Sequence, residues 1–162
     1  MSSYPDWFYY PSRNRPPDWV PTVAAVFAAA RDLMDSQAVT GLTSDSVLSH
    51  LRPGFESMGF QVETGKGKAN KIRRPVLYGE QGTELVSYEI DGWHDDHGIV
   101  LEREAGRGAL GNAVYRDLIR TPLIVDARFL VLGVMIEYHY KSGGKPMAFC
   151  SFRDARNILD AI

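Results

Sequence analysis

Three acidic residues, Asp91, Glu102 and Glu104, are the side chains of this sequence best placed to do chemistry together. Glu102 and Glu104 close the run 99–104, whose apolar start is typical of a strand. Alternate side chains of a strand share a face, so both carboxylates should point the same way. Asp91 ends the preceding expected strand, 85–91. Because neighbouring strands lie about 4.8 Å apart, we expect the three carboxylates to converge.

Converging carboxylates favour a bound cation. Like charges a few ångströms apart raise one another's pKa and repel, and a cation removes that repulsion. Hard oxygen ligands suit Mg²⁺ or Mn²⁺, and Mg²⁺ usually takes one or two carboxylates together with water and phosphate oxygens. Such an ion can lower the pKa of a bound water and stabilise charge on a phosphorus atom under attack. The alternative is that the alternating charges of 102–104 are the solvated face of an edge strand.

The rest of the chain predicts the elements that hold these residues. An aromatic, proline-rich arm covers 1–20, and a single domain covers 21–162. The elements expected in that domain are, in order, a helix over 22–34, a short helix from Thr43 or Ser44 that is interrupted at Pro53-Gly54, strands at 61–63, 76–78, 85–91 and 99–104, a helix over 112–120, a strand at 129–136, and a helix over 153–161 capped by Ser151.

The strands 76–78, 85–91 and 99–104 are expected to form an antiparallel meander, with a turn at 79–82 and a loop over 92–98. The nearly continuous apolar run 129–136 is typical of a strand covered on both faces. The predicted fold class is therefore α/β (α+β), with a central mixed sheet flanked by helices.

Two stretches of the sequence form a motif: Ile90-Asp91 and, after a short loop, Ile99-Val100-Leu101-Glu102-Arg103-Glu104. The motif resembles the PD-(D/E)XK, or restriction-endonuclease-like, nuclease superfamily, in the variant with Glu in place of the last Lys. The α-β-β-β-α-β order expected over 47–138 is similar to the core of that superfamily.

This resemblance implies Mg²⁺- or Mn²⁺-dependent hydrolysis of DNA phosphodiester bonds. Asp91 and Glu102 would be the metal ligands, and Glu104 would occupy the catalytic position where the family usually carries Lys. Glu56 would match a helical acid that some members add to the metal site, the alternative being a solvated helix residue.

A basic segment between Gly65 and Pro75 fits a substrate of dense negative charge, because Lys and Arg gain affinity for phosphates by releasing counterions. Arg107, between two glycines, is a further candidate for contact with the DNA backbone. A solvated loop and an ordinary turn are the respective alternatives. The segment contains no acid, and its cations are Lys66, Lys68, Lys71, Arg73 and Arg74.

The loop His94-Asp95-Asp96-His97 offers a rival metal site. Adjacent residues in a tight turn rarely aim at one point, so we expect a polar hairpin tip instead. Cys150 is the only cysteine, which excludes an internal disulfide and a cysteine-based zinc site. We expect it to be a buried small hydrophobe and not a nucleophile.

Composition narrows the class of protein further. The chain has 162 residues and a formal net charge of −2, and no apolar run approaches the ~20 residues that a membrane span requires. The N-terminus has neither the basic start nor the apolar run of a secretory signal, so we expect a cytoplasmic location.

Three functions are open. The first is a Mg²⁺-dependent endonuclease acting on DNA, as a homodimer if it cuts both strands, because one active site cuts one strand at a time. The second is a catalytically inactive domain of the same fold that binds nucleic acid or a protein partner. The third is a small metal-binding protein unrelated to nucleic acid.

Overall fold

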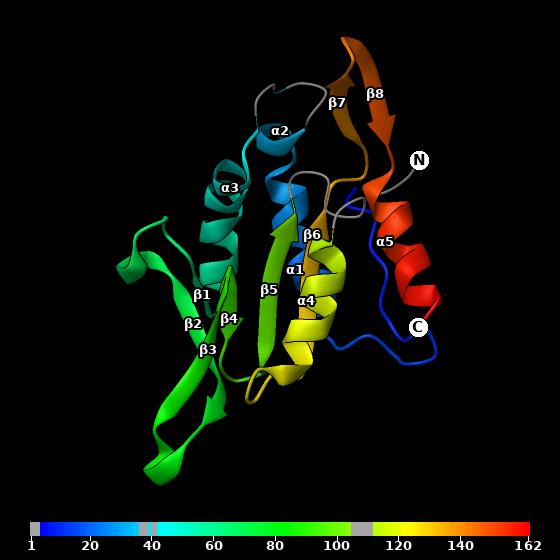
Figure 1. Ribbon diagram of the computed structural model, residues 1–162. Helices are drawn as coiled ribbons and strands as arrows, with labels where there is room; N and C mark the ends of the chain where they lie inside the picture. Colours follow the sequence, from blue (N-terminus) through cyan, green and yellow to red (C-terminus); the bar gives the residue numbers. More distant parts are fainter. Residues whose placement is uncertain (1–3, 36–38, 40–41, 105–111) are drawn as a thin grey trace.

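A four-stranded mixed sheet in the order β1-β4-β5-β6 forms the centre of the computed structural model, which describes residues 4–35, 39, 42–104 and 112–162 (Figure 1). β4 pairs antiparallel with both β1 and β5, and β6 runs parallel to β5. The predicted class, a mixed central sheet with helices, is therefore confirmed. The strands are β1 (Phe60–Val62), β4 (Gly92–His94), β5 (Ile99–Glu104) and β6 (Phe129–Val134).

Helices lie against both faces of this sheet (Figure 1). α1 and α3 pack on one face and α4 on the other, while α5 contacts the edge strand β6. None of the helices in the described part of the chain is long and apolar enough to cross a membrane. The bounds are α1 (Val20–Ala29), α2 (Arg31–Met34), α3 (Ser44–Ser57), α4 (Ala113–Arg120) and α5 (Ser151–Asp160).

The main core lies between α1, α3 and the sheet. Phe55 of α3 is fully buried and makes edge-to-face contacts with Phe27 of α1 and Phe60 of β1, with ring centroids 5.8 and 5.0 Å apart. Ile99 and Leu101 of β5 join the same cluster from the sheet. Residues 99 and 101 therefore face this main core, and the even-numbered residues of β5 face the other way, where Val100 is buried in a second cluster with Ile90, Trp93 and Ile124.

The first two helices differ from their predicted forms. The expected helix over 22–34 breaks at Ala30, whose φ and ψ of −93° and 2° leave the helical range, so α1 and α2 are separate. α3 instead runs without interruption through Pro53. Gly54 serves packing, because a Cβ there would lie 2.6 Å from Cγ1 of Val26 on α1. The predicted interruption at Pro53-Gly54 was therefore wrong.

A long hairpin, β2 (Ile72–Tyr78) and β3 (Glu84–Ile90), forms a two-stranded sheet that projects from the body (Figure 1). The predicted turn is confirmed, with the short 3-10 helix η2 (Glu80–Gly82) inside it. The predicted meander was wrong in its pairing. In the described part of the chain β3 pairs only with β2, and the chain continues through Asp91 into β4, which pairs with β5.

The C-terminal part contains a second hairpin, β7 (Tyr138–Ser142) and β8 (Lys145–Phe149), which was not predicted. Ser151 does not cap α5 as expected. It is the first helical residue, with Cys150 at the N-cap, and its buried Oγ has no hydrogen-bond partner among the described residues. Cys150 is half-buried.

The N-terminal arm packs on its own domain. Residues 4–19 contain no helix or strand. Trp19 meets Phe129 of β6 edge-on, with centroids 5.2 Å apart, and the guanidinium of Arg156 lies 4.6 Å from the ring centroid of Phe8. Aromatic side chains therefore hold the arm against β6 and α5.

Phe55→Ala should lower the free energy of unfolding by about 3–5 kcal/mol, because it removes a buried ring and leaves a cavity. Leu33→Ala is the matched control, since Leu33 is 52% exposed and surface changes stay within about 0.5 kcal/mol. Urea denaturation measures both variants. Equal losses in the two would contradict the assignment of Phe55 to the core.

Candidate functional site

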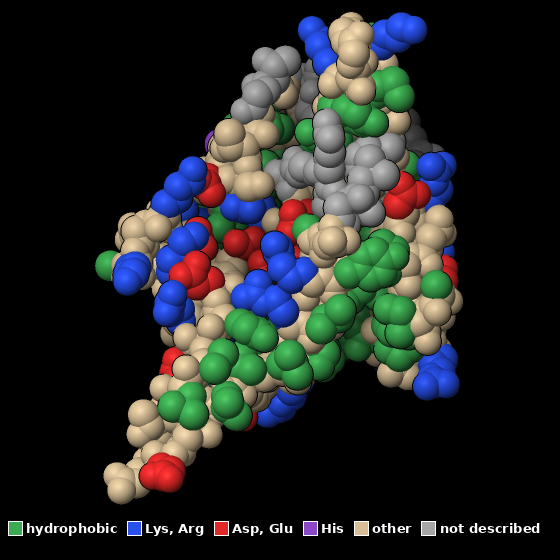
Figure 2. Space-filling model, viewed as in Figure 1, with side chains coloured by type: hydrophobic (Ala, Val, Ile, Leu, Met, Phe, Trp, Pro, Cys, Tyr) green, Lys and Arg blue, Asp and Glu red, His purple; other side chains and the backbone are tan. Residues whose placement is uncertain are grey.

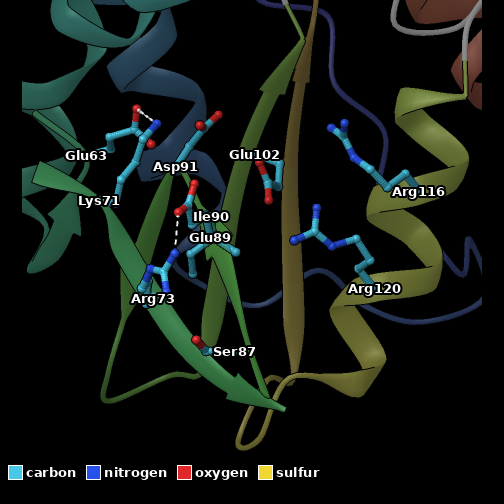
Figure 3. Close-up of a pocket in the computed structure, with 10 residues that line it drawn as sticks. All are labelled: Glu63, Lys71, Arg73, Ser87, Glu89, Ile90, Asp91, Glu102, Arg116 and Arg120. Atoms are coloured by element: carbon cyan, nitrogen blue, oxygen red, sulfur yellow. Dashed lines mark hydrogen bonds and ion pairs between the residues drawn. The ribbon is translucent and has the colours of Figure 1, made fainter. Parts of the chain in front are cut away.

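A cavity of about 510 Å³ opens between the β2–β3 hairpin, β5 and α4. Charged side chains dominate its lining, and Figure 3 shows Glu102 between Asp91 on one side and two arginines of α4 on the other. In Figure 2 basic and acidic side chains gather in the same region of the surface. The lining consists of Glu63, Lys71, Arg73, Ser87, Glu89, Ile90, Asp91, Glu102, Arg116 and Arg120.

The pairing of β4 with β5 brings Asp91 and Glu102 to this cavity. Gly92 is the Cα partner of Leu101, Asp91 comes just before Gly92, and Glu102 comes just after Leu101. Because the pairing is antiparallel, Asp91 and Glu102 lie at the same end of it. The backbone N–H of Arg103 donates to Oδ2 of Asp91 at 2.9 Å, which fixes that carboxylate against β5. Asp91 and Glu102 are therefore neighbours, as predicted. The pairing of β4 with β5 brings them together, and not the expected pairing of β3 with β5.

Glu104 shares the face of Glu102 but does not line the cavity. Its Oε1 accepts a hydrogen bond from Nη2 of Arg116 at 3.0 Å. Arg103 points to the opposite side of the strand, where its guanidinium lies 3.6 Å from Asp45 of α3. The three predicted carboxylates are thus divided: Asp91 and Glu102 face the cavity, and Glu104 holds an arginine at its rim.

The side chain of Glu102 makes neither a hydrogen bond nor an ion pair within the described ranges. Burial, followed by the negative charges of Asp91 and Asp117, raises the pKa of Glu102 to about 9, and Arg116 and Arg120 oppose this. Burial also raises the pKa of Asp91, against the opposing charge of Arg103. At neutral pH Glu102 is therefore held as the neutral acid unless additional positive charge enters the cavity.

The donor set for a metal is small. Among the described residues no group of three or more His, Cys, Asp or Glu side chains is arranged to hold an ion. Asp91 and Glu102 would supply two carboxylate oxygens, which is the number that Mg²⁺ usually takes from protein. No Lys or Arg side chain among the described residues forms an ion pair with Glu102. Asp91 and Glu102 therefore fit a hard divalent ion.

Asp117 of α4 is a buried carboxylate that was not predicted. It is 1% exposed, its Oδ1 accepts from Nε of Arg116 at 3.0 Å, and its Oδ2 has no partner among the described residues. Its charge raises the pKa of Glu104 as well, after the larger effect of burial. Asp117 thus orients Arg116 and adds negative charge behind Glu102.

Arg116 and Arg120 reach the cavity from one face of α4. Their i, i+4 spacing, which is visible in the sequence, places them one turn apart on a helix. On the inward side of this helix Val114 is buried, whereas the apolar Ile119 is 66% exposed because Asp117 takes the inward position.

Two members of the predicted basic segment line the cavity. Nζ of Lys71 donates to Oε1 of Glu63 at 2.7 Å, and Nη2 of Arg73 donates to Oε1 of Glu89 at 2.7 Å. The hydrogen bond to Glu63 raises the pKa of Lys71, and the one from Arg73 lowers the pKa of Glu89. Glu63, which is 6% exposed, is a site residue that was not predicted.

The other members of the basic segment lie elsewhere. Lys66 and Lys68 are exposed and outside the lining of the cavity. Arg74 follows Arg73 on a strand and so faces the opposite way, where its guanidinium stacks 4.1 Å from the ring centroid of buried Trp93. Arg107 lies outside the described residues.

Glu56 is not brought to the cavity. Its neighbour Phe55 points into the core, and the next residue of an α-helix lies about 100° further round the axis. The side chain of Glu56 is therefore exposed on α3, and Glu63 contributes the additional carboxylate of the cavity.

The rival metal site at 94–97 is taken up by structural contacts. His94 is buried at the end of β4, its Nε2 lies 2.9 Å from the carbonyl oxygen of Met58, and its ring stacks on that of His97 at 4.9 Å. Asp95 accepts a hydrogen bond from Nε1 of Trp93 at 2.9 Å. His94 therefore belongs to the core and not to the expected polar tip.

No protein-family model, curated protein or solved structure matches this chain. The chemistry of the cavity is therefore inferred from its geometry and charge.

In the absence of divalent metal, Glu102→Gln should make the protein more stable relative to the wild type as the pH rises from about 5 to about 8. The ordinary pKa of 4.5 is raised to about 9 in the fold, so in this window the unfolded chain loses a proton that the folded chain keeps. The wild type therefore loses stability with rising pH, and the variant lacks this loss.

Thermal unfolding midpoints measured across this range test the expectation. Below the ordinary pKa both states are protonated, so the two midpoints should approach one another there. Glu56→Gln, an exposed glutamate on α3, is the matched control and should follow the wild type at every pH. Parallel curves for the wild type and Glu102→Gln would contradict the burial of this carboxyl group.

Proposed function

We propose that this protein is a divalent-metal-dependent endonuclease of the restriction-endonuclease-like type, which hydrolyses phosphodiester bonds of DNA in the cytoplasm. The observation that supports this most is the cavity in which two carboxylates of raised pKa, Asp91 and Glu102, face four cationic side chains. Hydrolysis of a phosphodiester uses both kinds of group: positive groups that bind the phosphate oxygens, and a pair of acids that binds a metal ion beside the phosphorus.

The succession of elements supports the same type of fold. When only the strands of the central sheet are counted, the order is α3, β1, β4, β5, α4 and β6, and the β2–β3 hairpin is inserted between β1 and β4. This succession supports the α-β-β-β-α-β order expected from the resemblance, with β5 between an antiparallel and a parallel neighbour.

In this proposal Asp91 and Glu102 hold one Mg²⁺ or Mn²⁺ ion. When bound, the ion would polarise the phosphoryl group and lower the pKa of a coordinated water. Asp91 is oriented in advance by the N–H of Arg103, and Glu102 is available because no cation of the described chain pairs with it. Glu104 is a positioning residue here, since its carboxylate holds Arg116 at the rim of the cavity.

The cations of the cavity would bind phosphate oxygens on either side of the scissile bond. Arg120 is the best placed, because it stacks on the ring of Tyr88 at 4.2 Å and makes no ion pair with a described carboxylate. Arg73 is exposed, so its ion pair with Glu89 is weak in water and can be exchanged for a phosphate. These contacts carry no base recognition, so they would bind DNA of any sequence.

Asp91→Asn and Glu102→Gln should each reduce Mg²⁺-dependent cleavage of a long DNA to the level seen without metal. Both changes keep the size of the side chain but remove the negative charge that binds the ion. Agarose gels of plasmid DNA measure cleavage, and isothermal titration calorimetry with Mn²⁺ measures binding of the ion alone.

Glu56→Gln is the control for both measurements and should cleave like the wild type. Cleavage that persists in Asp91→Asn or Glu102→Gln would refute the assignment of the site. Salt-sensitive DNA binding without cleavage by the wild type would instead support an inactive domain of the same fold.

Arg120→Ala should weaken DNA binding without metal and reduce the slope of log K against log salt by about 1, because one phosphate contact is lost. Fluorescence anisotropy at several salt concentrations measures both quantities. Arg153→Ala on α5 is the matched control, since Arg153 is exposed and outside the cavity. An unchanged slope in Arg120→Ala would contradict its role.

A further inference from the structure

A second cavity, of about 760 Å³, follows the outer edge of β6. β6 is the last strand of the central sheet, and within the described residues it pairs only with β5 (Figure 1). Every residue from 128 to 137 lines this edge cavity, although successive side chains of a strand point to opposite faces. The cavity therefore opens on the edge of the strand, where the two faces meet, and not on one face alone.

The side chains of β6 are less buried than their types predict. The apolar run 129–136 is typical of a strand covered on both faces, yet each residue of β6 is only half-buried. On the neighbouring strand β5, Ile99, Val100 and Leu101 are fully buried. An apolar edge strand that stays open to solvent is a place where another strand can add.

The outer edge of β6 also carries unused backbone groups. Among the described residues, no backbone hydrogen bond joins 130–134 to any segment other than β5. The N–H and C=O groups of alternate residues point to opposite sides of a strand, so half of these groups point away from β5 toward the edge cavity. An extended backbone satisfies such a row of donors and acceptors, whereas a compact ligand satisfies few of them.

The N-terminal arm forms another wall of the edge cavity, since residues 4–11 line it as well. Two arginines hold the arm. The guanidinium of Arg31 lies 5.1 Å from the ring centroid of Tyr4, and that of Arg156 lies over the ring of Phe8. No backbone hydrogen bond joins the arm to β6 in the part of the chain that the structure describes. The arm thus borders the cavity without pairing with the strand.

Apolar side chains surround the open edge. Half-buried residues of three helices line the edge cavity: Phe27 of α1, Met34 of α2, and Phe152 and Leu159 of α5. Neighbouring strands place their side chains on shared faces, and both faces of β6 are apolar here. A strand that paired with β6 would therefore need apolar side chains at successive positions, and not only at alternate ones.

Cationic side chains of the edge cavity favour a ligand with acidic groups. Arg31, Arg128 and Arg156 line it, and none of them forms an ion pair with a carboxylate of the described chain. The carboxylates of the lining already take part in other interactions, and they are Asp6, Asp35, Glu104 and Glu137. Arginines without ion pairs beside an apolar cavity suit a peptide with Asp or Glu next to an apolar run.

We propose that β6 binds an extended segment of another protein, which adds to the four-stranded central sheet as a further strand. The segment has an apolar run of about four to six residues, which matches the length of β6, and an acidic residue beside it. Main-chain hydrogen bonds give affinity, and the apolar walls and arginines give selectivity. No residue lines both cavities, so this site is separate from the proposed nuclease site.

A displayed library of random dodecapeptides, selected on the immobilised protein without metal or DNA, supplies the probe. Enriched sequences should share an apolar run with Asp or Glu beside it. The most enriched peptide is then labelled with fluorescein, and fluorescence anisotropy measures its Kd. A selection that enriches no peptide, or only peptides without an apolar run, would overturn the proposal.

Two N-methylated forms of this peptide test the backbone pairing. Alternate N–H groups of a strand point to the same side, so methylation of one alternate set blocks pairing with β6 and methylation of the other set leaves it intact. One form should bind at least about 30-fold more weakly than the other, because several backbone hydrogen bonds are lost. Equal binding of the two forms, whether strong or weak, would contradict the addition of a strand.

Hydrogen exchange followed by mass spectrometry locates the bound peptide. Exchange within 129–134 should become slower when the peptide binds, and protection confined to the β2–β3 hairpin or α4 would overturn the assignment to β6. Arg156→Ala should raise the Kd by about 3-fold, because one charge contact is lost. Arg153→Ala, on the same helix but outside the edge cavity, is the matched control and should bind like the wild type. Equal affinities of these two variants would contradict the acidic residue of the ligand.

Discussion

Burial of the Glu102 carboxyl group beside the carboxylate of Asp91 is the constraint on which the site depends. Antiparallel pairing of β4 with β5 brings these residues to one cavity, and the sheet cannot separate them without losing that pairing. Asp91 is partly compensated by Arg103, but no cation of the described chain pairs with Glu102. The fold therefore holds a carboxyl group whose charged form is stabilised only when positive charge is added.

The surrounding elements offset the unfavourable burial of this carboxyl group only in part. α4 supplies two arginines, and it also buries Asp117, which adds negative charge and engages Arg116. Lys71, just before β2, and Arg73 of β2 are also present, and each is already bound to a glutamate. The result is a cavity of balanced charge in which Arg120 and Glu102 are the two groups least committed to partners among the described residues. A ligand that carries both a phosphate and a metal ion satisfies both.

Strand alternation was the part of the site that the sequence predicted best. A two-residue period places Glu102 and Glu104 on one face regardless of the details of packing, and β5 has that period. The cavity then separates the two, because Glu104 is drawn to Arg116. That contact depends on which side of α4 faces the sheet. From residue type alone Ile119 would be expected in the core and Asp117 at the surface, but in the structure Asp117 is buried and Ile119 is exposed.

The pairing of strands that are distant in the sequence could not be predicted from local sequence patterns. β4 is three residues long, and only Asp91 separates it from β3, so the sequence indicates one strand followed by a loop. In the structure these residues form two strands with different partners, because β3 pairs with β2 and β4 pairs with β5. The cations of the basic segment do not share one surface, because β2 begins within the segment and alternation along it directs Arg73 to the cavity and Arg74 to Trp93. Glu63 was overlooked because its partner, Lys71, lies eight residues away across a turn.

The anomalous diffraction of a crystal soaked in Mn²⁺ shows directly whether Asp91 and Glu102 bind a metal ion. We expect a peak between the carboxylates of Asp91 and Glu102, and none in a crystal of Glu102→Gln. A crystal without a peak in this cavity, or with one only at His94 and His97, would contradict this metal site.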